Sequence, residues 1–543
     1  MKLHRAPTLN GFQDFVTHLF QNATPGGRHS PSAQRSWLES SGWFWAILLV
    51  VTLWKSLAGM KLGLIFDECY YWEWSLHPQS CYFDHPPLTA WLIASAHRVF
   101  GHGILAVRFW AIVSGILLAL GGRLLATDMF GTNAGNRAGI FLLLAPIFAG
   151  NALLMTPDSF LMPAWAFAVF FAWKGYKAGS SPGWWVASGA AAGIGLLDKY
   201  TMILFYGGLA FLWLFTPGRR GPLFRGITMA AVVSFLFFLP VLRWNQTHDW
   251  SSFEHQIHHG FRNEHESLIN FENLANYAAF LIILVSPLLG LFCFRSAITR
   301  LEDERFRFLA LFYWTVVLFF GFSAAKAHVE ANWPMVAFVT GLILVAGDWE
   351  SYGRAWRASA LTLLLVADFG ALIGVTALAL PKDSPLAIRN LTLNTGWIRG
   401  FPGAEKLATA AQQGFNDFQG RIEEFQGPPE VADAIAVQFK KSGAAFLCLS
   451  SYQLAGIVAF YTPELESRLW LPYLGRYRFP WINDRIWTGE TALTAEWPHS
   501  GPDYSILFGT LTPPRALPVD GLRRPVFISL GKQYNPEQVR FKP

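Results

Sequence analysis

Long apolar runs alternate with short polar connections over residues 43–380. The first run, WFWAILLVVTLWKSLAGM at 43–60, is close to the length that crosses a bilayer as a helix. Because such a helix needs roughly 20 apolar residues, we expect a mainly α-helical membrane domain with about eleven transmembrane helices over 43–380. The ten further runs lie near 104–126, 138–156, 160–176, 184–197, 201–216, 227–243, 272–294, 308–325, 334–347 and 358–380.

The segment 1–42 precedes the first run and is too long to be the charged start of a cleavable signal peptide. Between Phe12 and Phe20, apolar residues recur at helical spacing, which favours an amphipathic helix lying on the membrane surface. A disordered tail is the alternative. Basic residues such as Lys2 and Arg5 favour a cytoplasmic position for the segment.

Two polar regions interrupt this pattern. A large loop over 61–103 follows the first run, and residues 381–543 are polar with frequent glycine and proline. Within the second region, AAFLCLSS predicts a short buried strand and YQLAGIVAFY predicts a helix. We expect a small α/β domain over 381–543, outside the membrane and on the periplasmic side.

The charge distribution indicates an orientation. If the predicted spans alternate, the Lys/Arg clusters, such as the one within 295–307, fall on the inner side of the membrane, as the positive-inside rule requires. The same alternation places every histidine after the first run on the outer side. We therefore expect the functional residues on the outer face of the protein, with the loop over 61–103 in the periplasm.

The composition supports a membrane protein, because 52% hydrophobic and 14% charged residues are too apolar for an ordinary soluble enzyme. The net charge of +6 comes without a basic stripe, so we assign it to inner loops and expect no nucleic-acid partner. Four cysteines imply no disulfide framework. A bridge between Cys69 and Cys81 in the outer loop is left open.

Ionisable side chains from distant segments are predicted to reach the same outer face. Asp67 lies in FDECYYW, Asp84 in YFDHPPL, Asp158 in LMTPDSF and Lys199 in GLLDKYT. An ionisable group at membrane depth is costly and is a functional candidate by default. Each of them alone would more often be a helix cap or a snorkelling side chain than a catalytic group, but their shared side favours one site.

In this order, DECYYW, DHPPL, TPDS, LLDKYT and HVEANWP resemble motifs of the bacterial polyprenyl-phosphate-sugar-dependent glycosyltransferases. This GT-C group includes the protein O-mannosyltransferases and the lipid A aminoarabinose transferases. The likeness spans most of 60–345 and extends more loosely to GWIRG and SSYQLAGIVAFY after residue 381. It implies a multi-pass enzyme of the bacterial inner membrane whose active site faces the periplasm. The donor would be a polyprenyl-phosphate-linked sugar, and the acceptor lipid A, another glycolipid or a protein.

The resemblance also implies roles for single side chains. Asp67 would be the general base that takes the proton of the acceptor hydroxyl, and Asp158 would be a second catalytic carboxylate. Lys199 would stabilise the departing phosphate. The further candidates for the donor phosphate are His85, Tyr70, Lys326, Arg262 and His328, and those for other substrate contacts are Glu68, Tyr71, Glu330 and Asn332.

A divalent metal ion is a further implication. In the aminoarabinose transferases an acid before paired prolines joins a histidine at such an ion, and Asp84 with His255 is the corresponding pair. His259 lies four residues on, so a helix would place it on the same face. Zinc, manganese or magnesium is the expected ion, with direct phosphate binding by the histidines as the alternative. No organic cofactor is expected.

Two departures leave the sugar open. The aminoarabinose transferases carry a basic residue where Tyr70 stands and a lysine where His85 stands. Histidines would replace these fixed charges with charges that depend on pH. A plain hexose or an acidic sugar is therefore as consistent with the sequence as aminoarabinose.

Two other functions fit a multi-span protein of this kind. A transporter or flippase of a lipid-linked sugar would place ionisable groups near the bilayer midplane. The predicted spans are nearly free of charge at their centres, which favours the glycosyltransferase. An O-antigen ligase-like enzyme is the other alternative, and the acidic and aromatic loop after the first span favours the glycosyltransferase over it.

Overall fold

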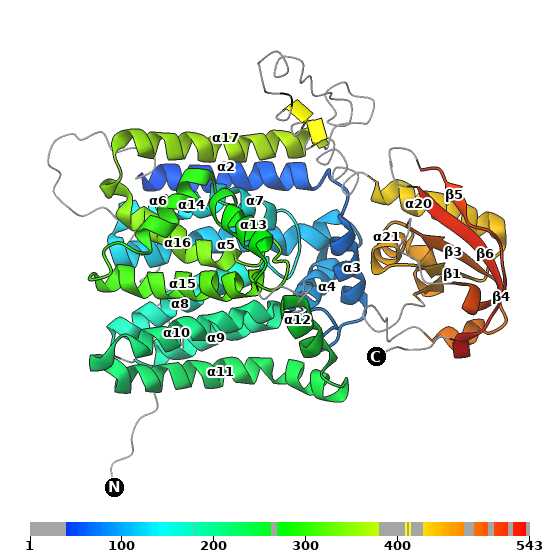
Figure 1. Ribbon diagram of the computed structural model, residues 1–543, viewed down its shortest axis with the longest axis horizontal. Coiled ribbons are helices and arrows are strands. Elements are labelled where there is room, and N and C mark those ends of the chain that lie inside the picture. Colours follow the sequence, from blue (N-terminus) through cyan, green and yellow to red (C-terminus); the bar gives the residue numbers. More distant parts are fainter. Residues whose placement is uncertain are drawn as a thin grey trace, which may run out of the picture. The chain divides into compact units, whose positions relative to one another are not determined.

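A computed structural model of the chain shows a helical bundle followed by a smaller α/β region (Figure 1). The expected surface helix within 1–42 and the segment around residue 381 lie outside the described residues, so those two domain boundaries stay predictions. The described residues are 40–179, 181–261, 269–378, 427–471, 483–497, 504–519, 525–538 and the isolated positions 405, 408, 409, 412 and 413.

The described chain up to residue 378 is mostly helical, because a helix satisfies the backbone polar groups of an apolar run internally. Its helices are α2 (Ser41–Gly59), α3 (Phe66–Leu76), α4 (Leu88–Phe100), α5 (Ile104–Phe130), α6 (Thr132–Leu144), α7 (Pro146–Asn151), α8 (Leu161–Lys177), α9 (Pro182–Asp198), η2 (Tyr200–Ile203), α10 (Leu204–Leu214), η3 (Pro217–Arg219), α11 (Arg220–Thr247), α12 (Ser251–Phe261), α13 (Phe271–Ile283), α14 (Pro287–Ser296), α15 (Glu304–Ala324), α16 (Met335–Asp348), η4 (Trp349–Ser351) and α17 (Arg354–Leu378).

The expected count of eleven spans is not confirmed. Among the described residues, four helices are long and apolar enough to cross a membrane: α2, α5, α11 together with η3, and α15. The pair α13 and α14 would be a fifth span, bent by 97°. The remaining runs form shorter helices. The run near 138–156, for example, breaks into α6 and α7 at Pro146, whose missing N–H cannot continue the helix.

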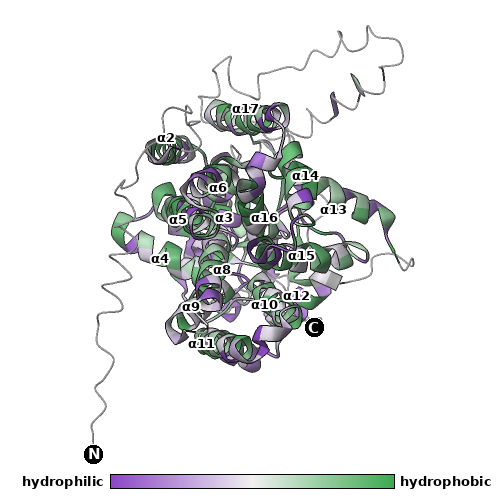
Figure 2. Cartoon of the chain, turned by 90° about the vertical axis from the view of Figure 1, so that its left-hand side faces the viewer, coloured by the Kyte–Doolittle hydropathy of each residue, from purple (hydrophilic) through white to green (hydrophobic). Residues whose placement is uncertain are grey.

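The peripheral helices expose apolar side chains. Figure 2 views the bundle along its helices, with α16 near the middle and α2, α11 and α17 at the edge. Leu49 on α2, Leu236 on α11 and Val366 on α17 are each more than half exposed, whereas α16 is almost entirely buried. Exposed apolar surface of this extent indicates contact with lipid.

The C-terminal α/β region is built around a mixed sheet with the strand order β2-β1-β3-β6-β4, and β5 pairs with β6. The strand predicted in AAFLCLSS and the helix predicted in YQLAGIVAFY are both confirmed, as β1 and α21. The helices of this region are α20 (Pro428–Ser442), α21 (Tyr452–Tyr461), η6 (Pro463–Arg468), η7 (Asp484–Trp487), η8 (Tyr504–Ile506) and η9 (Pro536–Gln538), and the strands are β1 (Phe446–Leu449), β2 (Leu469–Trp470), β3 (Ala492–Glu496), β4 (Phe508–Leu511), β5 (Arg515–Leu517) and β6 (Val526–Tyr534).

One apolar core joins α3 to the α/β region. Tyr70 and Trp72 of α3 belong to the same buried cluster as Leu454 of α21 and Leu447 of β1. Tyr70 and Trp72 therefore pack inside the protein, against the α/β region. This packing fixes α3, which carries Asp67 in its first turn.

Candidate active site

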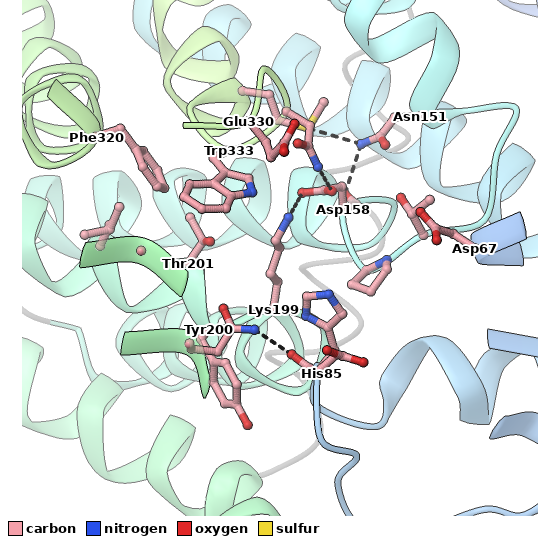
Figure 3. Close-up of a pocket in the computed structure, with 18 of the residues that line it drawn as sticks. Asp67, His85, Asn151, Asp158, Lys199, Tyr200, Thr201, Phe320, Glu330 and Trp333 are labelled. Carbon is pink, nitrogen blue, oxygen red and sulfur yellow. Dashed lines mark hydrogen bonds and ion pairs between the residues drawn. The ribbon is translucent and has the colours of Figure 1, made fainter. Parts of the chain in front are cut away.

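A cavity of about 800 Å³ lies where α3, the loop before α4, η2 and α12 meet the start of α21. Asp67, Asp158 and Lys199 all line it. Figure 3 shows Asp67, His85 and Lys199 arranged around this space. Three residues that are far apart in the sequence and were expected at one site therefore share one cavity.

Lys199 and Asp158 form a largely buried ion pair in this cavity. The Nζ atom of Lys199 donates to Oδ1 of Asp158 at 2.7 Å, and Nδ2 of Asn332 donates to Oδ2 at 2.7 Å. Asp158 is 4% exposed and Lys199 8%. An unpaired charge at this depth would be costly, so each partner holds the other in place.

Asp198 anchors the backbone next to Lys199. Its buried carboxylate accepts a hydrogen bond from Oγ1 of Thr89 at 2.9 Å and from the N–H groups of Phe160 and Leu161 at 3.0 and 2.9 Å. These N–H groups begin α8 and have no partner within that helix, and the helix dipole favours an anion there. α9 ends at Asp198, and Lys199 leaves it in an extended conformation toward the cavity.

The neighbouring carboxylates Asp67 and Glu68 have different surroundings. Asp67 lines the cavity, and the hydroxyl of Tyr452 lies 3.4 Å from its Oδ1. Glu68 is fully buried and accepts from Nε of Arg108 at 2.8 Å and from the N–H of Met155 at 3.1 Å. The structure thus contradicts the expected substrate contact of Glu68, because the carboxylate of Glu68 is already paired with Arg108 inside the protein.

Asp84 ties the loop before α4 to α12. Its carboxylate accepts from the hydroxyl of Tyr70 at 3.0 Å and lies 3.2 Å from Nε2 of His255. Nε2 of Gln256 donates to the backbone oxygen of Asp84 at 2.7 Å. Asp84 and His255, predicted as a pair, therefore meet at the cavity.

The Asp84–His255 pair supplies two ligand types that zinc and manganese accept. In the part of the chain that the structure describes, no group of three His, Cys, Asp or Glu side chains is placed to hold a metal ion. The side chain of His259, the third expected ligand, is outside that part. The residues present fit an ion whose remaining ligands would be water or substrate oxygens, and the metal stays a prediction.

His85 faces the cavity from the same loop (Figure 3). Its Nδ1 atom is buried and has no hydrogen-bond partner among the described residues. Burial, and then the charge of Lys199, lower the pKa of His85 to about 4. A charge on His85 that depends on pH, expected in place of a fixed lysine charge, stays a prediction, and the lowered pKa places its protonation below neutral pH. A neutral ring can still form a hydrogen bond with a ligand.

Two expected phosphate contacts lie outside the cavity lining. Nζ of Lys326 lies 4.7 Å from the ring centroid of Phe322. His328 pairs with Glu330 at 3.7 Å, and both side chains are about half exposed. Neither Lys326 nor His328 lines the cavity, although His328 contacts Glu330, which does. Arg262 is among the residues that the structure does not describe.

The three other residues that were expected to contact substrate lie at the cavity. Tyr71, Glu330 and Asn332 all line the cavity. Their roles stay predictions.

Cys69 and Cys81 are buried free thiols, so the structure contains no bridge between them.

The cavity also has an apolar wall that the sequence did not predict. Figure 3 places Phe320 and Trp333 on the side away from Asp67. Ile203, Leu204 and Phe319 line the cavity as well. A ligand with an ionic group and a hydrocarbon chain matches this division, because the ionic residues and the apolar residues border the same space.

Comparison with known proteins supports one class of enzyme. A family model described as dolichyl-phosphate-mannose-protein mannosyltransferase matches residues 84–244, a segment that includes Asp158 and Lys199. The lipid A galacturonosyltransferase RgtD of Rhizobium johnstonii is 25% identical over 378 residues, covering 68% of this chain and 78% of that protein.

Solved structures show the same fold. ArnT from Cupriavidus metallidurans bound to undecaprenyl phosphate superposes with a TM-score of 0.60 at 20% identity, covering 90% of this chain and 98% of that one. Its apo state gives a TM-score of 0.57 at 19% identity, with the same coverage. The family match and the curated relative support a glycosyltransferase enzyme of the GT-C type, and the ArnT structures show that the fold is shared.

Proposed function

We propose that this glycosyltransferase moves a sugar from a polyprenyl phosphate carrier to lipid A or a related glycolipid, at the periplasmic face of the inner membrane. The observation that carries the proposal is the single cavity that joins Asp67, the Asp158–Lys199 pair and an apolar wall. The named activity of the RgtD relative supports lipid A as the acceptor. The undecaprenyl phosphate bound to the ArnT relative supports the carrier.

Asp67 is the proposed general base. The acceptor hydroxyl attacks the anomeric carbon of the donor sugar, and its proton passes to the carboxylate of Asp67. The bond between that carbon and the phosphate oxygen breaks, and its electron pair leaves with the polyprenyl phosphate. Proton removal by a positioned side chain contributes roughly 10²–10⁴-fold to such reactions.

Lys199 is the proposed partner of the leaving phosphate. Its ammonium group is held by Asp158, so it is oriented before the substrate binds. The charge on the phosphate oxygen increases as the bond breaks, and a preorganised cation stabilises that state more than the ground state. His85 and Tyr70 line the cavity beside it and are the proposed hydrogen-bonding partners of the remaining phosphate oxygens.

Asp84 and His255 are the proposed protein ligands of a divalent ion, which would supply positive charge to the phosphate. Asp84 and His255 also contact each other at 3.2 Å, and Tyr70 and Gln256 bind Asp84 from α3 and α12. These contacts fix the position of the loop before α4.

Transfer by the purified full-length protein tests the proposal. The protein is given lipid A with undecaprenyl phosphate linked to galacturonic acid, to aminoarabinose or to a hexose, and lipid A is examined by mass spectrometry. We expect one donor to give a mass increase of one sugar residue, with release of undecaprenyl phosphate. No transfer from any of the three donors would contradict the proposal. In a parallel reaction, transfer of a whole oligosaccharide from a diphosphate carrier would instead identify a ligase.

A further inference from the structure

The helix α21 of the α/β region lies directly on α3, the helix that carries Asp67. A Cβ atom added at Gly456 would lie 2.9 Å from the backbone N of Tyr70 and 3.0 Å from the carbonyl carbon of Cys69. Only glycine permits the two backbones to approach this closely. The hydroxyl of Tyr461 accepts from the N–H of Leu64 at 2.8 Å and fixes the far end of α21 to the segment before α3.

This crossing brings a side chain of the α/β region into the cavity. Tyr452 is the first residue of α21, where Oγ of Ser451 accepts from the N–H of Leu454 at 3.2 Å and caps the helix. Tyr452 lines the cavity, its ring centroid is 4.5 Å from that of Tyr70, and its hydroxyl is 3.4 Å from Oδ1 of Asp67.

The two contacts of Tyr452 connect it to Asp67 and, through Tyr70, to Asp84. The hydroxyl faces Asp67, and the ring packs on Tyr70, whose own hydroxyl donates to Asp84. A tyrosine hydroxyl that donates to a carboxylate oxygen orients that carboxylate. The 3.4 Å separation is long for such a bond, and hydrogen bonds of this kind often shorten only when substrate is bound.

We propose that Tyr452 is a positioning residue for Asp67, so that the α/β region completes the active site through the α21–α3 crossing at Gly456. This inference rests on the proposed role of Asp67 as the base. The region after residue 427 is thus part of the catalytic unit, and its displacement from α3 lowers turnover.

Three variants of the full-length protein test this. Tyr452→Phe keeps the ring on Tyr70 and removes the hydroxyl, and the matched control Tyr461→Phe removes a hydroxyl of the same helix outside the cavity. Gly456→Ala separates α21 from α3. For each we measure kcat and donor KM of sugar transfer, the unfolding temperature, and the Kd for undecaprenyl phosphate.

We expect Tyr452→Phe to lower kcat about tenfold, with donor KM and the Kd for undecaprenyl phosphate within about twofold, because a hydrogen bond to a charged group is lost without loss of the ring. Tyr461→Phe should lower the unfolding temperature and should lower kcat less than Tyr452→Phe does, because it loosens the far end of α21 without removing a group from the cavity. Gly456→Ala should lower kcat at least as much as Tyr452→Phe and should also weaken undecaprenyl phosphate binding, since Tyr70 moves with α3. Equal effects of Tyr452→Phe and Tyr461→Phe on kcat, or no effect of Tyr452→Phe, would overturn the inference.

The binding measurement separates this inference from the proposed function. Undecaprenyl phosphate can be titrated whether or not a sugar donor has been identified. If the wild-type protein does not bind it, the proposed function fails. If the wild type binds it and Gly456→Ala binds it equally well, the link between the α21–α3 crossing and the site fails by itself.

Discussion

The ammonium group of Lys199 lies 2.7 Å from Oδ1 of Asp158, inside a cavity that Asp67 also lines. Asn332 holds the other oxygen of Asp158, so the carboxylate has a fixed partner on each side. The cation is therefore already oriented when an anionic ligand arrives.

Replacement of Lys199 by alanine should lower kcat/KM for the donor by about 10²-fold or more, because a preorganised cation is lost from the leaving phosphate. The protein should also lose stability, since Asp158 remains buried without its counter-charge. Donor kinetics and thermal unfolding in detergent measure the two effects. Lys326→Ala, outside the cavity lining, is the control and should retain wild-type donor kinetics. Unchanged donor kinetics in Lys199→Ala would remove Lys199 from the phosphate site.

Two neighbouring acids should give opposite phenotypes. Asp67→Asn should lower kcat by about 10²–10⁴-fold while the protein folds and inserts normally, because it removes only the proposed base. Glu68→Gln should instead lower the stability by about 3–5 kcal/mol, because it leaves Arg108 buried without its ion-pair partner. Turnover assays and thermal unfolding of both variants distinguish the loss of catalysis from the loss of stability. Wild-type turnover in Asp67→Asn would assign the base to another residue.

Removal of divalent ions should lower activity if Asp84 and His255 hold one. We expect a chelator-treated sample to lose turnover, added zinc, manganese or magnesium to restore it, and elemental analysis of the untreated protein to show about one ion per chain. His255→Ala should lose both the bound ion and its restoring effect. Full activity in a sample shown to be free of metal would contradict the metal site and leave direct phosphate binding by histidine.

The stability of the protein should decrease below about pH 6.5 in a way that depends on His85. The pKa of His85 is lowered from its ordinary value of 6.5 to about 4 by burial. The unfolded chain therefore binds a proton at higher pH than the folded chain, and stability is lost as the pH falls from 6.5 through 4. Unfolding temperatures of the wild type and of His85→Gln across this range test the effect. Equal slopes in the two proteins would show that His85 does not titrate in this way.

The local elements of this fold were largely predictable. The first span, the strand in AAFLCLSS and the helix in YQLAGIVAFY all follow from short apolar patterns, and the structure has them as α2, β1 and α21. The span count was less predictable. Several apolar runs fold as short or bent helices inside the bundle, because burial against other helices satisfies them as well as lipid does.

The site was predictable only in part. Asp67, Asp158 and Lys199 share the cavity, as their motifs indicated. The pairing of Glu68 with Arg108 was missed, although an arginine inside the apolar run 104–126 was a signal that a buried acid must lie nearby. Tyr452 was also missed as a site residue. Its contact with Asp67 depends on how the α/β region packs on α3, and no short sequence pattern predicts that contact.

A structure of the full-length protein with undecaprenyl phosphate bound tests the central claim most directly. We expect the phosphate inside the cavity, with one oxygen about 2.7–2.9 Å from Nζ of Lys199, as in charge-assisted hydrogen bonds generally, and with the polyprenyl chain along the apolar wall that includes Phe320. A phosphate bound at any position away from Lys199 and Asp67 would contradict the account.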